Sequence, residues 1–347
     1  MNILVCNAGS TSLKMRLYSM PEEEMLIEKK LERVKNYEAG IREFLQLIDG
    51  KYTVDAVGFK TVLSKDHYGV HRIDDGVIQG MKEYMVVAPA HNSFYLEAIE
   101  TFQKVMPLVP MVGVFETAFH QTMKPEAFLY SVPYEWYEKY GVRKYGYHGA
   151  SHSYVASVLT KELGEKYKAV SCHLGGSSSL TALVDGKSVD TSFGMSLQCG
   201  VPQNNRCGSF DPYLIFFMMK YAGMSADEIE MQLRTQSGLL GVSGVSNDMR
   251  DLKEDALKNE RSRLAIDMYI REVTGYIGRF AAIMGGLDAV AFTGGTGEKS
   301  DLVRSRVMKN LEFLGDVKVF VIPANEELGV ARETYKNIID QSGPGVK

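Results

Sequence analysis

Short apolar runs alternate with longer amphipathic stretches along most of this chain. Runs with the length and the β-branched residues of buried strands lie at residues 54–59, 109–114, 169–172, 289–292 and 317–322. Between them, apolar residues recur at helical spacing, and the longest such stretch covers about 257–284. Strands that alternate with helices in this way predict a mixed α/β fold in which helices cover the sheets.

Two of the predicted helices carry start signals. Ser225, followed three residues later by Glu228, has the pattern of a capping box. Asp211 before Pro212 predicts an N-cap followed by proline at the first helical position. In the longest helix we expect the apolar residues to pack in a core or between subunits.

The chain also resembles itself once. The segment VCNAGSTS at residues 5–12 resembles SCHLGGSS at residues 171–178, which lies 166 positions later. Each copy stands between two strand-like runs. A strand, a Gly/Ser turn and a second strand used twice predict a duplicated domain. Chance similarity between two short turns is the alternative.

Composition and net charge restrict which kinds of protein and of binding partner fit this chain. With 347 residues, 45% of them hydrophobic and 24% charged, the chain is long enough for two globular domains. A net charge of -4 with scattered Lys and Arg argues against nucleic-acid and membrane partners. The apolar run at residues 3–5 is too short for a signal peptide. We therefore expect a cytoplasmic protein that acts on a small molecule.

The cysteines indicate neither a disulfide framework nor a thiolate metal site. Cys6, Cys172, Cys199 and Cys207 form no Cys-x-x-Cys pair. Cys6 and Cys172 each end an apolar run, where a cysteine behaves as a small hydrophobic residue. We expect inert thiols.

Three glycine-rich turns follow predicted strands, at residues 7–12, 173–179 and 293–298. Glycine lets the backbone approach a ligand and direct its N–H groups at phosphate oxygens, and Ser or Thr hydroxyls add donors. None of the turns has the Gly-Lys-Ser/Thr ending of a P-loop or fits Gly-x-Gly-x-x-Gly. One such turn is typical of an ordinary hairpin, but three in one chain favour phosphate binding.

Longer motifs resemble those of the acetate kinase family. They include VFETAFHQTM at 114–123 and YGYHGASH at 145–152. Further matches, in the order of the family, are GKSVDTS at 186–192, SGLLGVSG at 237–244, DMRD at 248–251 and NEEL at 325–328. Together with the turn that begins at Asn7, these motifs extend over nearly the whole chain.

This resemblance implies a fold and a reaction. The fold is α/β, with duplicated actin-like, sugar-kinase-like domains and an active site in the cleft between them. We place the first domain at residues 1–118 plus 328–347 and the second at 119–327. The implied enzyme reversibly transfers a phosphoryl group between ATP and a short-chain carboxylate, giving an acyl phosphate and ADP, with Mg²⁺. We expect it to be a homodimer.

The resemblance also implies roles for individual residues. The metal would be held by Asn7 and Glu326. Charge on the transferred phosphoryl group would be stabilised by His148 and Arg206, with Glu116 where the family has a catalytic aspartate. The acid would be bound by Lys60, Val62, Ala90, His91, Tyr147 and Leu197. The nucleotide would be bound by Ser10, Ser12, Lys14, His173, Gly175, Gly176, Ser177, Asp248, Arg250, Gly295, Gly297 and Glu298.

Two departures from the family pattern affect the chemistry. Lys60 replaces an arginine that binds carboxylate, and a lysine cannot reproduce the bidentate grip of a guanidinium. Glu116 replaces the catalytic aspartate and is one methylene longer, a displacement that catalytic groups tolerate poorly. His148, Arg206 and Glu326 are retained, which favours a retuned enzyme. The alternatives are a nucleotide-binding regulatory protein without turnover and a sugar kinase of the same fold.

The residues of the acid pocket and the length of the chain also differ from the family pattern. Ala90 stands for a leucine, Tyr147 for a phenylalanine and Leu197 for a proline. The lost leucine opens space and the tyrosine adds a hydroxyl donor, which predicts an acid larger or more polar than acetate. The alternative is that Leu197 fills the space vacated at Ala90. The chain is also shorter than usual family members.

Overall fold

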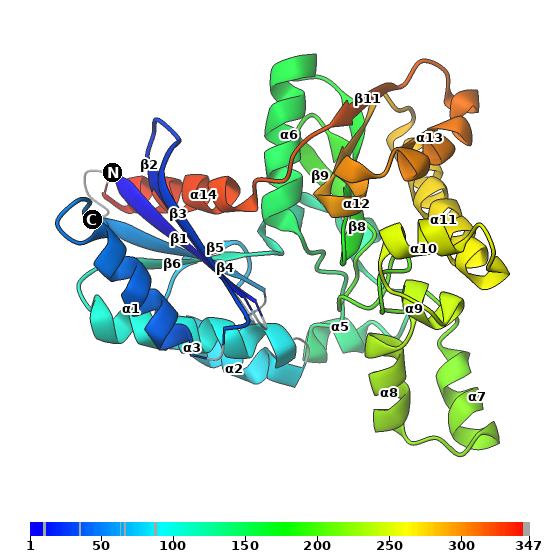
Figure 1. Ribbon diagram of the computed structural model, residues 1–347, viewed down its shortest axis with the longest axis horizontal. Helices are drawn as coiled ribbons and strands as arrows, with labels where there is room; N and C mark the ends of the chain where they lie inside the picture. Colours follow the sequence, from blue (N-terminus) through cyan, green and yellow to red (C-terminus); the bar gives the residue numbers. More distant parts are fainter. Residues whose placement is uncertain (10–11, 35, 63, 66, 87–88, 343–347) are drawn as a thin grey trace. The chain divides into compact units, whose positions relative to one another are not determined.

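The computed structural model describes residues 1–9, 12–34, 36–62, 64–65, 67–86 and 89–342, and for residues 86, 89–91 and 342 it describes the backbone alone. The chain forms two compact units (Figure 1). The first contains Met1–Gln121, His148–Tyr154 and the chain from Asn325 onward, and the second contains Thr122–Tyr147 and Val155–Ala324. The domain boundaries expected from the sequence stay a prediction.

The first unit is built on a six-stranded sheet in the order β3-β2-β1-β4-β6-β5. Its strands are β1 (Asn2–Ala8), β2 (Ser12–Ser19), β3 (Glu24–Glu32), β4 (Ala56–Thr61), β5 (Val70–Arg72) and β6 (Met111–Phe115). β1, β2 and β3 form an antiparallel meander, β4 and β6 continue parallel to β1, and β5 is antiparallel to β6.

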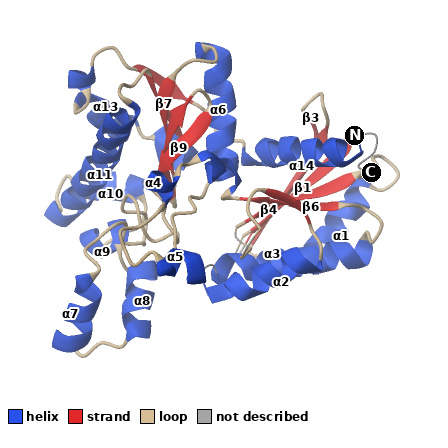
Figure 2. Cartoon of the chain, turned by 180° about the vertical axis from the view of Figure 1, so that it is seen from behind, coloured by secondary structure: helices blue, strands red, loops and turns tan. Residues whose placement is uncertain are grey.

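Helices cover both faces of this sheet. They are α1 (Tyr37–Ile48), α2 (Asp75–Glu83), α3 (Pro89–Val105) and α14 (Glu326–Ser342). α14 packs on one face and α1 and α3 on the other, as both ribbon views show (Figures 1 and 2). β1, β4 and β6 are therefore buried on both sides, which explains why their sequences read as continuous apolar runs.

The second unit is built on a five-stranded sheet in the order β11-β10-β7-β8-β9. Its strands are β7 (Lys168–Leu174), β8 (Ser178–Val184), β9 (Lys187–Thr191), β10 (Ala289–Thr293) and β11 (Lys318–Val321). The long helix α11 (Glu260–Met284) packs on β7 and β8, and its Ile270, Val273 and Ile277 are buried in the core.

The remaining helices are shorter. They are α4 (Pro125–Phe128), α5 (Glu135–Tyr140), α7 (Tyr213–Tyr221), α8 (Ala226–Thr235), α9 (Gly238–Ser243), α10 (Met249–Asp255), α12 (Gly294–Lys299) and α13 (Asp301–Lys309). α6 (Gly149–Leu163) begins in residues of the first unit and continues in the second. Within the described part of the chain, no helix has the length and apolar character needed to span a membrane.

The internal repeat is structural, as the sequence predicted. β1 at residues 2–8 corresponds to β7 at 168–174, with the offset of 166 that relates the two sequence segments. Each of these strands is the first of an antiparallel three-stranded meander. On its other side, each sheet continues with two parallel strands, which are β4 and β6 in the first unit and β10 and β11 in the second. The chain therefore uses one topology twice.

Several local predictions are confirmed and others need correction. The capping box of Ser225 and Glu228 is present. The helix expected at Pro212 begins at Tyr213 instead, although Asp211 Oδ1 does accept from the Tyr213 N–H at 3.0 Å. The glycine-rich segment after β10 is the short helix α12 rather than an open turn. Cys6 and Cys172 are buried, free thiols, and burial raises the pKa of Cys6 to about 12.

Candidate functional site

Three predicted site residues stand at the carboxyl ends of neighbouring parallel strands in the first unit. Asn7 lies near the end of β1, Lys60 near the end of β4, and Glu116 directly after β6. The strand register places Cys6 beside Phe59 and Thr61 beside Phe115. The carboxyl edge of such a sheet is where α/β proteins bind their ligands.

Lys60 forms two ion pairs at this edge. Its Nζ lies 2.6 Å from Glu326 Oε2 and 3.2 Å from Glu116 Oε1. Burial alone would lower the pKa of Lys60, but Glu116 and Glu326 together hold that pKa well above its ordinary value. Burial raises the pKa of Glu116, whose residue is 5% exposed, and Lys60 opposes part of this rise. Lys60 is therefore a half-buried cation shared by two carboxylates.

Asn7, predicted with Glu326 as a metal ligand, is hydrogen-bonded to the neighbouring Glu327. Its Nδ2 donates to Glu327 Oε1 at 3.1 Å, and its Oδ1 accepts from the buried Tyr95 hydroxyl at 3.2 Å. Both ends of the amide are thus held by side chains of the first unit. Glu326 and Glu327 are the first two residues of α14, so one carboxylate reaches Lys60 and the next reaches Asn7.

Glu327 is a site residue that the sequence interpretation missed. Besides Asn7, it pairs with Lys14 at 3.2 Å and with Arg16 Nη1 at 3.1 Å. The adjacent glutamates of the NEEL motif were a signal for it. Nothing in the sequence indicated Arg16 or Tyr95, because their roles depend on strand pairing and on the packing of α3.

The oxygen donors at this edge fit a hard divalent cation. Asn7 Oδ1 and the carboxylates of Glu326 and Glu327 are ligands of the kind Mg²⁺ takes in ones or twos, beside phosphates and waters. Among the described residues no cluster of three His, Cys, Asp or Glu side chains forms a complete protein cage. The oxygen atoms at this edge therefore fit a cation that takes one or two protein ligands.

His148 stands at the start of α6 in a left-handed backbone conformation, with φ of 59°. The N–H of the following Gly149 donates to the Glu116 carbonyl at 2.9 Å, and an added Cβ there would lie 2.4 Å from the same oxygen. This close approach requires glycine and ties the His148 segment to the end of β6.

The other predicted residues of the first unit are only partly described. Gly9 and Ser12 exchange backbone hydrogen bonds of 2.8 and 3.4 Å across the first glycine-rich turn, and Val62 is buried. Ser10 lies outside the described residues, as do the side chains of Ala90 and His91, whose backbones belong to α3.

In the second unit, a pocket of about 620 Å³ brings together five of the predicted nucleotide-binding residues. They are Gly175 and Gly176 in the turn after β7, Asp248 and Arg250 at the start of α10, and Gly295 in α12. β7 and β10 are parallel neighbours, with His173 beside Thr293, so both glycine-rich segments follow the same edge of the sheet. Glycines of both segments and charged side chains thus line one cavity.

Asp248 and Arg250 form a bidentate ion pair at the N-terminus of helix α10. Asp248 caps the helix by accepting from the Arg250 N–H at 2.8 Å, and its two oxygens accept from Arg250 Nε at 3.0 Å and Nη2 at 2.6 Å. These bonds from Arg250 lower the pKa of Asp248 to about 2. The Arg250 side chain is 86% exposed, so its remaining N–H groups are accessible to a ligand.

Glu298 and Gly297 have structural contacts. Glu298 Oε1 accepts from the backbone N–H groups of Gly294 at 3.0 Å and Ala324 at 2.9 Å, and Arg304 donates to the Gly297 carbonyl. These bonds hold α12 in place beside the pocket.

Arg206 lies near the Gly175–Ser177 turn. Its Nη1 donates to Ser177 Oγ at 3.1 Å and to Gln203 Oε1 at 3.2 Å. Burial lowers the pKa of Arg206, and the neighbouring Arg234 lowers it further. Among the residues that the structure describes, no carboxylate forms an ion pair with this guanidinium.

The expected free hydroxyl of Tyr147 is a prediction that the structure corrects. Tyr147 is 1% exposed, and its hydroxyl donates to the Met195 carbonyl at 2.6 Å. A hydroxyl proton held this way is not offered to a ligand. Leu197 follows two residues later, is half-buried, and accepts at its carbonyl from Gln203 Nε2.

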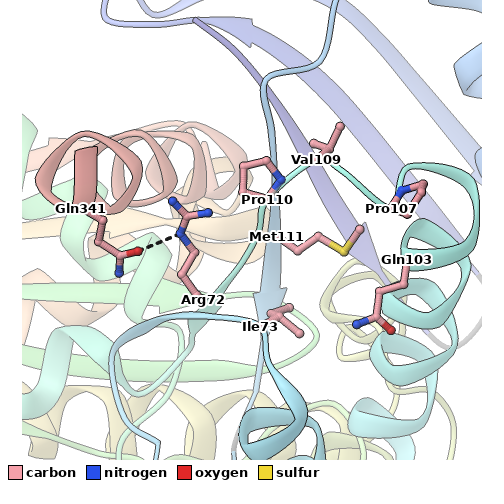
Figure 3. Close-up of a pocket in the computed structure, with 8 residues that line it drawn as sticks. All are labelled: Arg72, Ile73, Gln103, Pro107, Val109, Pro110, Met111 and Gln341. Atoms are coloured by element: carbon pink, nitrogen blue, oxygen red, sulfur yellow. Dashed lines mark hydrogen bonds between the residues drawn. The ribbon is translucent and has the colours of Figure 1, made fainter.

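A different pocket of the first unit, about 410 Å³, contains none of the predicted site residues (Figure 3). It lies beside Met111, the first residue of β6, whereas Glu116 follows the last. Arg72 in its wall donates to Gln341 at 3.0 Å. This pocket is therefore at the opposite edge of the sheet from the candidate site.

Comparison with known proteins identifies the family of this chain. A sequence profile of the Acetokinase family matches residues 43–323. The chain is 38% identical to acetate kinase from Shouchella clausii and 39% identical to acetate kinase from Geobacillus kaustophilus, over 96% of this chain and 98% of each relative. Those alignments span 389 positions against 347 residues here, so the relatives carry residues that this chain lacks.

Solved structures confirm the expected duplicated actin-like fold. Acetate kinase from Porphyromonas gingivalis superposes with a TM-score of 0.87 at 32% identity, covering 97% of this chain and 99% of that one. A propionate kinase from Francisella tularensis gives 0.89 at 32% identity, covering 96% and 99%. A putative N-acetylmannosamine kinase from Listeria monocytogenes, at 0.51 and 13% identity, shares the fold alone. By its sequence and its fold together, this chain belongs to the acetokinase family.

Proposed function

We propose that the chain is an ATP-dependent carboxylate kinase whose preferred acid is not acetate. The observation that carries the proposal is Arg206, a buried guanidinium beside the Gly175–Ser177 turn that has neutral acceptors and, in the described part of the chain, no carboxylate partner. Such a cation favours an anionic ligand, and phosphoryl transfer requires charge neutralisation of this kind. The acetate kinases and the propionate kinase among its relatives support the same assignment.

In the proposed reaction an oxygen of the acid forms a bond to the γ-phosphorus of ATP while the bond from that phosphorus to ADP breaks. Arg206 and His148 would donate to the oxygens of the transferred group, and the N–H group of Gly176 would contact the remaining phosphates. Bound Mg²⁺, held by Glu326 and Asn7, would neutralise phosphate charge. The reverse reaction uses the same contacts.

The state of Lys60 supports a preference for acids other than acetate. An ammonium that two carboxylates already share, at 2.6 and 3.2 Å, offers a weak grip on a third. A longer acid compensates through apolar contacts, each added methylene being worth about 1 to 3 kcal/mol in a fitted pocket. Because the Tyr147 hydroxyl is bonded to Met195, it does not support a preference for hydroxylated acids.

The test is a hydroxamate-trapping screen of the purified protein with ATP, Mg²⁺ and carboxylates of one to six carbons. We expect an acid of three or more carbons to exceed acetate in kcat/KM by at least about tenfold. The variant Lys60→Arg restores a bidentate group and should lower the KM for acetate. Lys65→Arg, an exposed lysine paired with Glu83, is the matched control.

The possible results distinguish the proposed acid preference from the proposed kinase activity. Acetate as the best acid, with an unchanged KM in Lys60→Arg, would refute the substrate preference but leave a carboxylate kinase. ATP binding without ADP release against any acid would refute the kinase assignment.

A further inference from the structure

Gln203 is a buried amide at the centre of a hydrogen-bond network in the second unit. The residue is 0% exposed. Its Oε1 accepts from Ser177 Oγ at 2.9 Å and from Arg206 Nη1 at 3.2 Å, and its Nε2 donates to the Leu197 carbonyl at 2.7 Å. The donors on one side and the carbonyl on the other leave only one orientation of the amide that satisfies all three bonds.

The backbone around Gln203 is fixed as well. The Gln203 N–H donates to the Arg206 carbonyl at 3.1 Å, which closes a four-residue turn, and the Gln203 carbonyl accepts from the Leu239 N–H at 2.8 Å. Gly238 packs against this turn at φ of 60°, and an added Cβ there would lie 2.1 Å from the Gln203 carbonyl oxygen. The turn is therefore seated on the start of α9.

Ser177 completes a closed triangle. Its hydroxyl donates to Gln203 Oε1 and accepts from Arg206 Nη1 at 3.1 Å, so the guanidinium has two neutral oxygen acceptors that also bond to each other. Neutral acceptors orient a guanidinium without cancelling its charge, whereas a carboxylate would do both. The Arg206 charge stays available to a ligand.

We propose that Gln203 is a positioning residue, which orients Arg206 toward the transferred phosphoryl group and links it to the Leu197 segment. The inference rests on the proposed function, since it concerns how the same site performs phosphoryl transfer. Gln203 touches no reacting atom in this role and acts through Arg206.

The main test is Gln203→Met, which keeps the length of the side chain and removes both hydrogen-bonding groups. A donor displaced by about 1 Å loses much of its effect, so we expect kcat to fall at least about tenfold. The KM for ATP and the KM for the acid should each change by less than about threefold, because a positioning defect acts mainly in the transition state. Gln198→Met, in the same loop, is the matched control, since Gln198 Oε1 accepts no hydrogen bond from the described residues.

A double-mutant cycle separates positioning from a general structural role. If Gln203 acts through Arg206, then Gln203→Met should change the residual rate of Arg206→Ala by less than about twofold. An equal loss of rate in both backgrounds overturns the proposal, as does a Gln203→Met enzyme with unchanged kcat.

A second measurement requires no catalytic activity. Side-chain ¹⁵N NMR of the wild-type protein should show distinct, slowly exchanging Arg206 Nη signals, assigned by their absence in Arg206→Lys. Averaged signals in the wild type would overturn the proposal. If the acid screen detects no acyl phosphate, the kinase assignment fails, while the NMR spectra of the wild type and of Gln203→Met still decide whether Gln203 holds Arg206.

Discussion

At the scale of single residues, the departures at Lys60 and Glu116 form one unit. The lysine is shorter than the arginine it replaces and the glutamate is longer than the aspartate, and in the structure the two side chains meet at 3.2 Å. Glu326 completes the group at 2.6 Å from Lys60. Loss of the lysine would remove the ion pair of the buried Glu116 carboxylate, which is costly. The two exchanged side chains are therefore in direct contact.

The prediction at this scale concerns the donors to the phosphoryl group. Arg206→Ala and His148→Ala should each lower kcat about a hundredfold or more, because each removes a preorganised donor to developing charge. Steady-state assays with the best acid of the screen measure this. Both variants should keep the thermal midpoint of the wild type within a few degrees. Near-normal turnover in both would exclude these residues from the transition state.

At the scale of elements, sites form where strands and helices end. Asn7, Lys60 and Glu116 follow parallel strands, and Glu326 and Glu327 open α14. In the second unit the N-terminus of α10 carries Asp248, whose carboxylate accepts from the Arg250 N–H and guanidinium. Free N–H groups and exposed strand ends are the backbone groups available to a ligand, so the chemistry gathers there.

The prediction at this scale is a pH dependence of the α10 cap. Bonds from Arg250 lower the pKa of Asp248 to about 2, below the value of about 3.9 for an unfolded aspartate. The carboxylate therefore stabilises the fold fully above pH 4 or so and loses this effect as the pH falls toward 2. Carboxyl ¹³C NMR should show Asp248 titrating near pH 2, and Asp248→Asn should remove that dependence. Titration of Asp248 near pH 4 would contradict its ion pair with Arg250.

At the scale of the whole molecule, one topology serves twice, and helix α7 leaves a large apolar surface exposed. Its exposed side chains, with the exposed fraction of each residue, are Tyr213 (74%), Leu214 (52%), Phe216 (52%), Phe217 (53%), Met219 (40%) and Tyr221 (82%). An aromatic side chain covers about 150 to 250 Å², so the four aromatics alone expose roughly 400 to 650 Å². That approaches the roughly 800 Å² per partner of a stable interface.

The prediction at this scale is the homodimer expected from the sequence, with α7 in its interface. Sedimentation equilibrium should give twice the mass of the chain, and Phe216→Lys with Phe217→Lys should shift the protein toward monomer. Lys220→Ala, a change of the helix's one charged residue, should leave the dimer intact. A monomeric wild type would refute the dimer, and a dimer that survives both lysines would place its interface elsewhere.

Much of the fold was readable from the sequence because its signals are local. The repeat of Gly/Ser turns, the apolar runs of the central strands and the Ser225 cap each depend on residues close together in the chain. The family motifs are local in the same sense. Neighbouring residues sufficed to predict most elements, the duplication and the family.

The contacts within the candidate sites were decided only by the tertiary structure. Asn7 is hydrogen-bonded to Glu327, which lies 320 positions away in the sequence. The Tyr147 hydroxyl donates to the carbonyl of Met195, which lies 48 positions away. No motif in the sequence indicated a role for Gln203. Its amide joins a hydrogen-bond network only because the fold brings Ser177, Leu197 and Arg206 around it. The sequence by itself determined which elements form and in what order, because spacing and backbone preference are properties of adjacent residues. Which polar group each buried side chain meets depends on packing between distant elements, where an ångström of displacement makes or breaks a hydrogen bond.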